Sequence, residues 1–320
     1  MKIIAEIGTN HEGDLGLAVE MIHAFAGAGA DIVKFQAFVV EDMVPKSAPY
    51  YKRMKKLEVK KDWYPVLIKE CEKAGVEFLS TATSFKSLEW MEESGAKMYK
   101  VASGNATHTP IIDKLIEIGK PIILSLGLLE VSEIIDLVEY FEKKGFDLSK
   151  LSLLHCHVEY PTPIEKSNLK NISVLKEMFP EITIGYSDHT ISTLTPAIAT
   201  ALGAEIIEKH VYLKRGNLGM DYDAAISLDE FKEMVKNIKD TEKMLKSDFR
   251  INQKYKFEYR RSFHAKRDIK KGEKLTWENI KISRPEDGIK PKFYKEVIGR
   301  EASEDIKEGE AIKWEKLKIY

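Results

Sequence analysis

The stretches Ile184-Gly185-Tyr186-Ser187-Asp188-His189-Thr190 and Ile206-Ile207-Glu208-Lys209-His210 decide the predicted fold. Each contains a short apolar run of the kind that forms a buried strand, and each delivers a histidine where the run ends. If the two strands are neighbours in a barrel, His189 and His210 converge at one mouth. A metal ion and a reaction are expected there, because barrel active sites lie at the carboxyl ends of the strands.

Apolar runs of strand length alternate with longer segments of helical period in the first 246 residues. Amphipathic segments include Leu15 to Ala28, Trp63 to Ala74 and, after the last strand, Leu228 to Leu245. The predicted strands are residues 3–7, 31–38, 76–82, 96–103, 121–127, 151–157, 182–187 and 204–211. Strand then helix, eight times over, predicts a (β/α)8 TIM barrel of the α/β class. A doubly wound open sheet would use the same elements, but the strand count and the site pattern favour closure.

The composition excludes several classes of partner. The 320 residues are 43% hydrophobic, enough for one large domain and a small one. Fifty basic residues against 51 acidic ones leave a net charge of -1, so we expect no nucleic acid and no membrane partner. The sequence has no apolar run of membrane-spanning length, its start does not resemble a signal peptide, and its two cysteines suggest no disulfide framework. We therefore expect a cytoplasmic protein.

Polar residues stand at the ends of the predicted strands, where an ordinary buried strand would avoid them. Lys34 and Gln36 are two residues apart and point to one face of their strand. Lys100 ends the fourth strand, and a lysine in an apolar strand needs a partner. The same mouth would receive Thr81, Ser103, Ser125 and Ser187, and Asn10-His11-Glu12-Gly13 after the first strand. Two lysines, several hydroxyls and two histidines predict a site for an anionic, phosphorylated substrate beside a divalent metal.

Three further histidines have other interpretations. His155 and His157 lie in or at the end of an apolar run, so we interpret them as structural or supporting residues rather than as ligands. His11 is expected either to reach the metal or to pack the barrel mouth as a turn residue.

The composition and the pattern of the sequence change after about residue 246. Residues 247–261 form a charged segment that we interpret as a linker between a barrel domain, residues 1–246, and a small domain, residues 262–320. The small domain contains a repeat in which Asp268-Ile269-Lys270-Lys271-Gly272-Glu273 is matched by Asp305-Ile306-Lys307-Glu308-Gly309-Glu310, and the match continues to Ile282 and Ile319. Each copy is typical of two extended pieces around a glycine turn, which predicts a β-rich domain with pseudo-symmetric halves. So small a domain is expected to pack on something.

Several motifs follow one another in order: Ile7-Gly8-Thr9-Asn10-His11-Glu12-Gly13, Val33-Lys34-Phe35-Gln36, Tyr160-Pro161-Thr162-Pro163, Gly185-Tyr186-Ser187-Asp188-His189-Thr190 and Glu208-Lys209-His210. Together they resemble the N-acetylneuraminate (sialic acid) synthase family, which includes legionaminate and pseudaminate synthases. The tail, with Ser283-Arg284-Pro285, resembles the antifreeze-like or SAF domain of that family. The resemblance covers nearly the whole chain.

The resemblance implies a reaction. Phosphoenolpyruvate condenses with an open-chain N-acyl hexosamine, either N-acetylmannosamine or a 2,4-diacetamido-trideoxyhexose. The products are a nine-carbon 2-keto acid and phosphate. It also implies Mn²⁺, with Mg²⁺ or Co²⁺ as alternatives, and a homodimer in which each SAF domain reaches the partner barrel. The residues alone leave open whether the tail docks on its own barrel or on the partner's.

The resemblance also implies roles for individual residues. His189 and His210 would hold the metal; Lys34, Thr81, Lys100, Ser103, Ser125 and Ser187 would bind phosphoenolpyruvate; Gln36, Tyr160, Asp221 and Arg284 would face the sugar. Lys34 and Lys100 would neutralise the anion, and Glu12 or Asp188 would activate water as a general base, a choice that the sequence leaves open.

The chain departs from the family pattern in places that leave the sugar open. Asn105 stands where the family commonly has glutamate, and His157-Val158 stands where Thr-Asn is frequent. Two rival functions remain: another phosphate-binding barrel lyase, such as an aldolase with a Schiff-base lysine, and a non-catalytic carbohydrate-binding protein.

Overall fold

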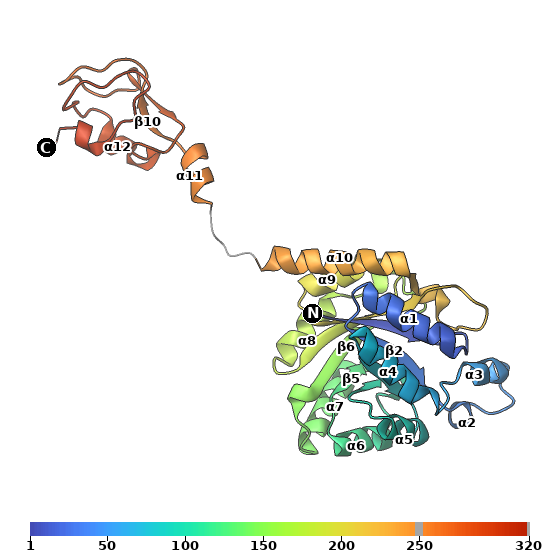
Figure 1. Ribbon diagram of the computed structural model, residues 1–320. Helices are drawn as coiled ribbons and strands as arrows, with labels where there is room; N and C mark the ends of the chain where they lie inside the picture. Colours follow the sequence, from blue (N-terminus) through green and yellow to red (C-terminus); the bar gives the residue numbers. More distant parts are fainter. Residues whose placement is uncertain (247–251, 319–320) are drawn as a thin grey trace. The chain divides into compact units, whose positions relative to one another are not determined.

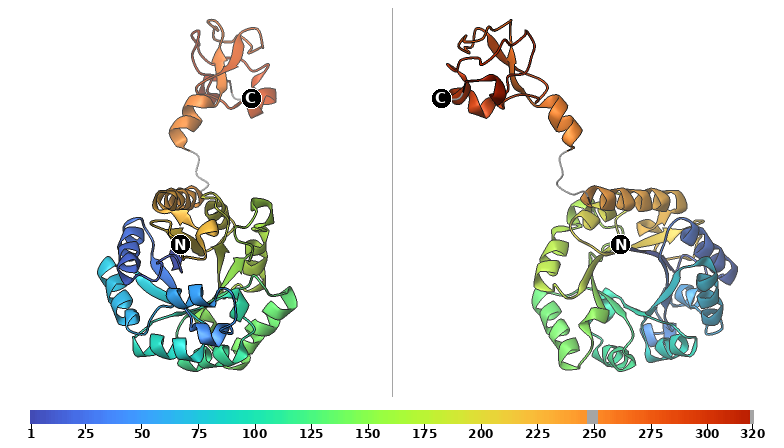
Figure 2. Two further views of the ribbon diagram at one scale, coloured as in Figure 1. Left: turned by 90° about the vertical axis from the view of Figure 1, so that its right-hand side faces the viewer. Right: turned by 60° about the vertical axis from the view of Figure 1, so that its left-hand side comes forward.

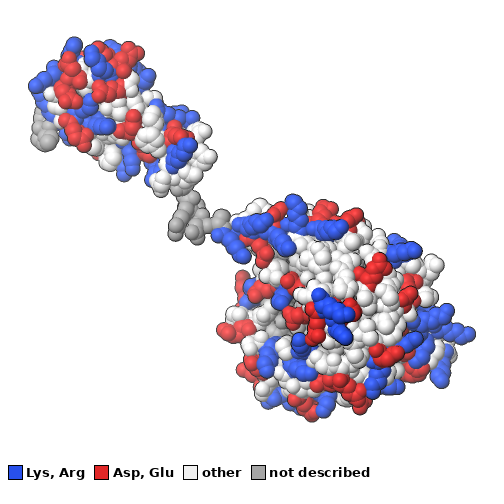
Figure 3. All heavy atoms as spheres, viewed as in Figure 1, with Lys and Arg blue, Asp and Glu red and all other residues white. Residues whose placement is uncertain are grey.

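The structure, a computed structural model, describes residues 1–246 and 252–318 in two compact units that divide after Lys246 (Figure 1). Lysine, arginine, aspartate and glutamate side chains are interspersed on the visible face of each unit (Figure 3). Among the described helices, none combines the length and the apolar character needed to cross a membrane.

The first unit is a closed parallel barrel, as Figure 2 shows in its right-hand view. Each strand pairs in parallel with the next along the chain, and β1 pairs with β8 to close the ring. A short strand β9 (Ile226–Ser227) pairs in parallel with the last two residues of β8. The strands are β1 (Lys2–Gly8), β2 (Ile32–Ala37), β3 (Glu77–Ala82), β4 (Tyr99–Val101), β5 (Ile122–Ser125), β6 (Leu151–Cys156), β7 (Thr183–Asp188) and β8 (Ile206–Tyr212). The predicted TIM barrel is confirmed.

Helices surround the ring of strands (Figure 2). They are α1 (Leu15–Gly27), α4 (Trp63–Ala74), α5 (Phe85–Glu93), α6 (Thr109–Ile118), α7 (Val131–Lys143), α8 (Lys170–Met178), α9 (Thr195–Ala201) and α10 (Leu228–Leu245). Local signals set their ends: Asp14 caps α1 by accepting the amides of Gly16 and Leu17, and Gly75 ends α4 at φ 73°. Two short helices, α2 (Val40–Met43) and α3 (Tyr51–Leu57), lie in the connection between β2 and α4.

The barrel interior changes from apolar to polar along the strands. Six buried apolar side chains form a cluster inside the ring: Ile4, Ile32, Leu79, Ile123, Leu154 and Ile206. Because side chains alternate along a strand, the residues two positions further on point inward too. Those six residues are Glu6, Lys34, Thr81, Ser125, Cys156 and Glu208. The apolar cluster therefore supports a polar layer towards the carboxyl ends of the strands.

The second unit has its own small core. Strands β10 (Ser262–Ala265) and β11 (Ile280–Ser283) pair antiparallel, and helices α11 (Gln253–Tyr259) and α12 (Tyr294–Val297) belong to the same unit. The apolar cluster includes Phe263, Leu275 and Ile312. Of the predicted linker, residues 247–251 lie outside the described residues, as does the last repeat position, Ile319. Within the predicted linker, residues 253–259 form the helix α11.

The repeat halves of this unit are tied to each other reciprocally. Asp268 accepts the amide of Glu308 at 2.9 Å and the ammonium of Lys307 at 3.0 Å. Asp305 does the same for the amide of Lys271 at 2.8 Å and the ammonium of Lys270 at 3.0 Å. The aspartate that opens each copy therefore holds the glycine turn of the other copy.

Candidate active site

A cavity of about 300 Å³ opens at the carboxyl ends of the barrel strands, a volume suited to a small molecule. Side chains from all eight strands or the loops that follow them line it. They include Glu6, Lys34, Gln36, Phe38, Met43, Thr81, Lys100, Ser103, Asn105, Ser125, Val158, Tyr160, Ser187, His189, Glu208 and His210. The cavity therefore brings together most of the residues that the sequence nominated.

The floor of the cavity is a buried cluster of two lysines and two glutamates. Lys34 Nζ lies 3.1 Å from Glu6 Oε2 and 3.3 Å from Glu208 Oε2. Lys100 Nζ lies 3.9 Å from Glu208 Oε1 and donates to Ser125 Oγ at 2.6 Å. Glu6 Oε2 and Glu208 Oε2 are paired with Lys34 by charge and distance, without hydrogen-bond geometry. The need of each lysine for a partner is thus met by carboxylates on β1 and β8, which reach Lys34 and Lys100 across the barrel interior.

The four charges shift one another's pKa in different directions. Burial alone would raise the pKa of Glu208, but the ammonium groups of Lys100 and Lys34 lower it to about 2. Burial lowers the pKa of Lys100 to about 8, although Glu208 opposes the shift. Burial raises the pKa of Glu6 despite Lys34 beside it. Two carboxylates in one cavity therefore differ: Glu208 is held ionised, and Glu6 takes up a proton more readily.

His189 and His210 meet at the ends of β7 and β8, with ring centroids 5.5 Å apart. His189 Nδ1 lies 2.6 Å from the carbonyl oxygen of His157, which fixes this nitrogen as the donor and leaves Nε2 with a lone pair. Tyr160 stacks on His189 at 4.0 Å, and its hydroxyl lies 2.8 Å from Nε2. Burial, followed by the neighbouring His210, lowers the pKa of His189 to about 3, so its ring is neutral at physiological pH.

The two imidazoles fit a partial metal site. His210 Nδ1 is buried without a hydrogen-bond partner, and His189 Nε2 presents a lone pair to the same cavity. Within residues 1–246 and 252–318, no group of three histidine, cysteine, aspartate or glutamate side chains has metal-binding geometry. A metal held here would take two protein ligands and complete its shell with water or substrate, as open catalytic sites do.

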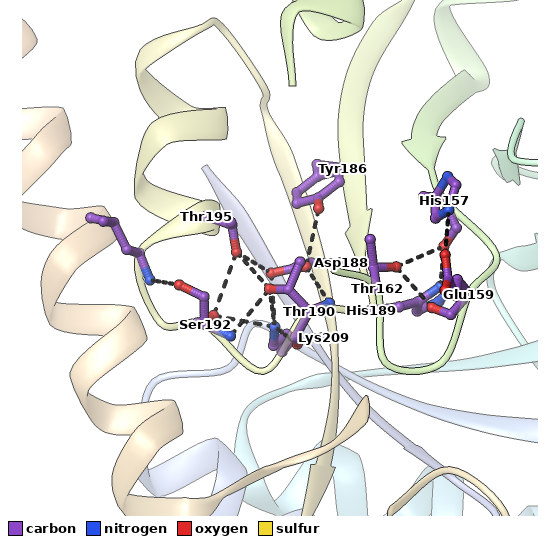
Figure 4. Close-up of polar contacts among 11 residues, drawn as sticks. His157, Glu159, Thr162, Tyr186, Asp188, His189, Thr190, Ser192, Thr195 and Lys209 are labelled. Carbon is purple, nitrogen blue, oxygen red and sulfur yellow. Dashed lines mark hydrogen bonds and ion pairs between the residues drawn. The ribbon is translucent and has the colours of Figure 1, made fainter. Parts of the chain in front are cut away.

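Asp188 does not face the cavity, which argues against the predicted base role. Inside β7 the neighbouring Ser187 points inward to Glu208 at 2.9 Å, so Asp188 points to the outer face. There it accepts from Lys209 Nζ at 2.8 Å, Thr195 Oγ1 at 2.7 Å and the amide of Thr190 at 2.8 Å (Figure 4). Its carboxylate is committed to a buried structural network behind His189.

Glu12 is also committed elsewhere. Its carboxylate accepts the amides of Asn217, Leu218 and Gly219 and the hydroxyl of Tyr222. It is absent from the cavity lining, so its placement does not support the predicted role as a base for water at the metal. His11 packs against Trp63 at 5.6 Å, in agreement with the packing interpretation.

The remaining nominated residues divide between the two units. Asp221 follows β8, accepts from Thr9 Oγ1 at 2.9 Å and lies 4.0 Å from His210 Nδ1. Arg284 belongs to the second unit, where its guanidinium lies 5.0 Å from the ring centre of Tyr259. His155 stacks on Tyr186 at 5.7 Å and bonds the carbonyl of Ser167, which is a structural role.

Glu6 and Glu208 are the site residues that the sequence predictions did not nominate. Glu208 belongs to the motif Glu208-Lys209-His210, and Glu6 lies in the second half of the first strand. Both follow an inward-facing isoleucine by two residues, so strand alternation carried the signal for both.

Comparisons with known proteins identify the family of the chain. The model of the NeuB family matches residues 21–249, and that of the SAF domain matches residues 260–318. The chain is 36% identical to the N,N'-diacetyllegionaminic acid synthase of Campylobacter jejuni, over 94% of this chain and 96% of that protein. It is also 36% identical to the pseudaminic acid synthase of Helicobacter pylori, over 95% and 94%.

A solved structure shows the same architecture. The crystal structure of the N-acetylneuraminic acid (sialic acid) synthetase of Leptospira borgpetersenii is similar with a TM-score of 0.74 and 33% identity. The similarity covers 79% of this chain and 88% of that one. The chain belongs to the NeuB family, the family of sialic, legionaminic and pseudaminic acid synthases, and carries a SAF domain.

Proposed function

We propose that the protein condenses phosphoenolpyruvate with an open-chain N-acyl hexosamine, giving a nine-carbon 2-keto acid and phosphate. The observation that carries this proposal is the buried pair Lys34 and Lys100 at the base of a cavity whose rim holds two histidines. C3 of phosphoenolpyruvate attacks the sugar aldehyde, water adds to C2, and the C2–O bond to phosphate breaks. One water is consumed and one phosphate is released.

The anion end of the cavity suits phosphoenolpyruvate. Lys34 and Lys100 supply positive charge. The hydroxyl groups of Thr81, Ser103 and Ser125 line the same cavity. Charged donors combined with directional hydroxyl bonds recognise phosphate and carboxylate oxygens. In the free protein Glu6 and Glu208 balance the two lysines, so the bound anion competes with these carboxylates for the same ammonium groups.

The two imidazoles support a divalent metal, for which we propose Mn²⁺. When bound, such an ion would act as a Lewis acid on the aldehyde oxygen and orient it. His189 and His210 would hold it, with Tyr160 released from His189 Nε2. The carbonyl of His157 keeps His189 in the tautomer that a ligand requires.

Glu6 is the proposed proton acceptor for the attacking water. It lines the cavity, its Oε2 is ion-paired with Lys34 but accepts no hydrogen bond, and burial raises its pKa. Gln36 donates to its other oxygen at 3.0 Å and orients the carboxylate. Glu208, which the lysines hold ionised, would instead keep both ammonium groups in place.

The mouth of the cavity supports an N-acylated acceptor. Phe38, Met43 and Val158 give it an apolar wall, which suits the methyl group of an acyl chain. Asn105 also lines the cavity, where it donates to the carbonyl of Ala82 at 3.3 Å.

One observation favours a second function. A lysine whose pKa is lowered to about 8 by burial is partly neutral near physiological pH, so Lys100 could form a Schiff base with a carbonyl substrate as in an aldolase. Borohydride in the presence of substrate would trap that adduct, whereas the condensation proposed here involves no covalent bond to lysine.

The deciding experiment is a phosphate-release assay with phosphoenolpyruvate, Mn²⁺ and a panel of N-acyl and di-N-acyl hexosamines. We expect sugar-dependent phosphate release with at least one acceptor and a 2-keto acid product by mass spectrometry. Borohydride trapping on Lys100 without phosphate release would replace this proposal with the aldolase.

A further inference from the structure

The loop that follows β8 carries Asp221 to the candidate site and is held from two sides. Asp221 Oδ2 accepts from Thr9 Oγ1 at 2.9 Å and lies 4.0 Å from His210 Nδ1. His210 Nδ1 has no hydrogen-bond partner. The position of this carboxylate beside His210 therefore depends on what fixes the loop.

Glu12 holds the amide side of the loop. Its Oε2 accepts the amides of Asn217 and Leu218 at 2.9 and 2.8 Å, and its Oε1 accepts the amide of Gly219 at 2.6 Å. Tyr222 donates its hydroxyl to Oε1 at 2.7 Å. Burial would raise the pKa of Glu12, but these donors lower it overall, so the carboxylate is ionised and fully used.

Arg53 of α3 holds the carbonyl side of the same loop. It donates to the carbonyl oxygens of Leu218 and Gly219, both at 2.7 Å. The side chain of Leu218 packs against the apolar cluster formed by Phe38, Val40, Met54 and Leu57. Glu12 thus accepts all three backbone N–H groups of residues 217–219, and Arg53 donates to two of their carbonyl oxygens.

The loop backbone is shaped for this carboxylate. A Cβ atom on Gly216 would overlap the carboxylate of Glu12, and one on Gly219 would lie 2.7 Å from Asn10 Oδ1 and from the ring of Tyr222. Glu12 itself has φ 58°, a left-handed conformation that costs energy in a residue with a side chain. The contact between Glu12 and the loop thus combines an unfavourable backbone conformation at Glu12 with close approach at Gly216 and Gly219. This combination indicates that the contact is specifically maintained.

We propose that Glu12, with Arg53, is a positioning residue that sets Asp221 beside His210 and the sugar, and that it is not the base of the reaction. The effect on the sugar rests on the function proposed above. The hold of Glu12 on the loop does not, because it involves only contacts within the free protein.

The test compares Glu12→Gln with the full-length wild-type protein by hydrogen exchange and by kinetics. The amide group of glutamine would turn a donor towards backbone donors, so exchange of the amides of residues 217–219 should accelerate roughly tenfold or more. With phosphoenolpyruvate and the accepted sugar, KM for the sugar should rise about tenfold, while KM for phosphoenolpyruvate stays within about twofold. The kcat pH profile should keep its shape.

Two further variants keep the test decisive. Arg53→Ala removes the hydrogen bonds to the carbonyl oxygens of Leu218 and Gly219. Because Arg53 is exposed, this variant should fold even if Glu12→Gln folds poorly, and exchange of the amides of residues 217–219 should again accelerate. Glu230→Gln is the matched control: Glu230 also accepts a backbone amide, that of Ser227 at 2.7 Å, but at the start of α10. It should leave exchange at 217–219 and turnover unchanged.

The outcomes separate the two proposals. Wild-type exchange at residues 217–219 in both Glu12→Gln and Arg53→Ala overturns the positioning role. So does loss of the acid limb of the kcat profile in Glu12→Gln with an unchanged sugar KM, since that is the signature of a base. If wild-type protein turns over no sugar, the proposed function fails, and the exchange experiment still decides whether Glu12 holds the loop.

Discussion

At the scale of single residues, the central feature is the four-charge cluster of Lys34, Lys100, Glu6 and Glu208 on the cavity floor. Burying four ionised groups is expensive, and such a cluster is often less stabilising than apolar residues of the same volume. The arrangement is therefore poor evidence for a stability role. It is readily explained by a site that exchanges its own carboxylates for an incoming anion.

Lys100 gives the first prediction, a fall in activity at alkaline pH. Burial lowers its pKa to about 8, so the free protein carries an ammonium below that pH and a neutral amine above it. Because the anion requires the ammonium, kcat/KM for phosphoenolpyruvate should fall about tenfold per pH unit above about 8. Lys34 does not share this limb, since Glu208 and Glu6 outweigh its burial and raise its pKa.

The matched variant for this prediction is Lys100→Arg. A guanidinium stays charged throughout the range, so the variant should be less active but should lose the alkaline limb. A wild-type profile that stays flat to about pH 9.5 would contradict the assignment.

Glu6 gives the second prediction. Glu6→Gln should lower kcat by about 10²- to 10⁴-fold, the usual range for a missing general base, and should remove the acid limb of the kcat/KM profile. The sign follows from the raised pKa of Glu6: its carboxylate, the active form, is lost as pH falls through that value. Phosphoenolpyruvate binding, measured by calorimetry, should not weaken, because the variant removes a competing negative charge. An unchanged kcat would exclude Glu6.

Strand alternation explains which of these residues the sequence predicted. Ser187, His189 and His210 were correctly placed in the cavity because they end strands, and Lys34 and Lys100 because they interrupt apolar runs. Asp188 follows the inward-facing Ser187 by one residue, so alternation turns its side chain to the outer face, where it meets Lys209. The partners of Glu12 lie more than 200 residues away in the chain, so no local pattern could have shown them.

At the scale of elements, the Asp188–Lys209 pair connects β7, β8 and the start of α9 behind the candidate metal site. Both side chains are 0% exposed. Lys209 also donates to the carbonyls of Thr190 and Ser192, and Thr190 Oγ1 lies 2.9 Å from Thr195 Oγ1 (Figure 4). The network fixes the backbone on either side of His189.

Removing one partner of this pair gives the third prediction. Asp188→Asn leaves a buried ammonium without its counter-charge, so the free energy of unfolding should fall by about 3–5 kcal/mol in urea titrations. Adding Lys209→Met should recover much of the loss, because the uncompensated charge is then gone. The control is Glu139→Gln, which breaks the exposed pair with Lys143 and should leave the unfolding free energy unchanged. Equal losses in the single and the double variant would contradict this account.

At the scale of the whole molecule, the chain consists of two units with separate cores. The apolar clusters that stabilise the barrel lie within residues 1–246, and the cluster of the SAF domain lies within residues 263–317. The repeat pattern predicted a β-rich, pseudo-symmetric second domain, and the reciprocal contacts of Asp268 and Asp305 supply its physical basis. The sequence could not predict α11, because a charged segment of low apolar content has little helical periodicity to detect.

The fourth prediction concerns how the SAF domain serves the barrel. We propose a homodimer in which Arg284 of one protomer contacts the sugar at the barrel of the other. Arg284→Ala and Lys100→Met should each be nearly inactive alone, the first through the sugar contact and the second through the anion contact. In a mixed dimer, one site receives an intact Lys100 from one protomer and an intact Arg284 from the other. Equal mixing after subunit exchange should therefore restore about a quarter of the wild-type activity.

Docking of each SAF domain on its own barrel predicts a different result. Every site in every mixed dimer would then keep one of the two substitutions, and mixing would restore nothing. Subunit exchange is verified independently by mass spectrometry of differently tagged protomers, so a lack of activity is not confused with a lack of mixing. If mixing the two inactive variants restores activity, the site must combine units from different chains. If verified mixed dimers stay inactive, Arg284 belongs to the site of its own chain.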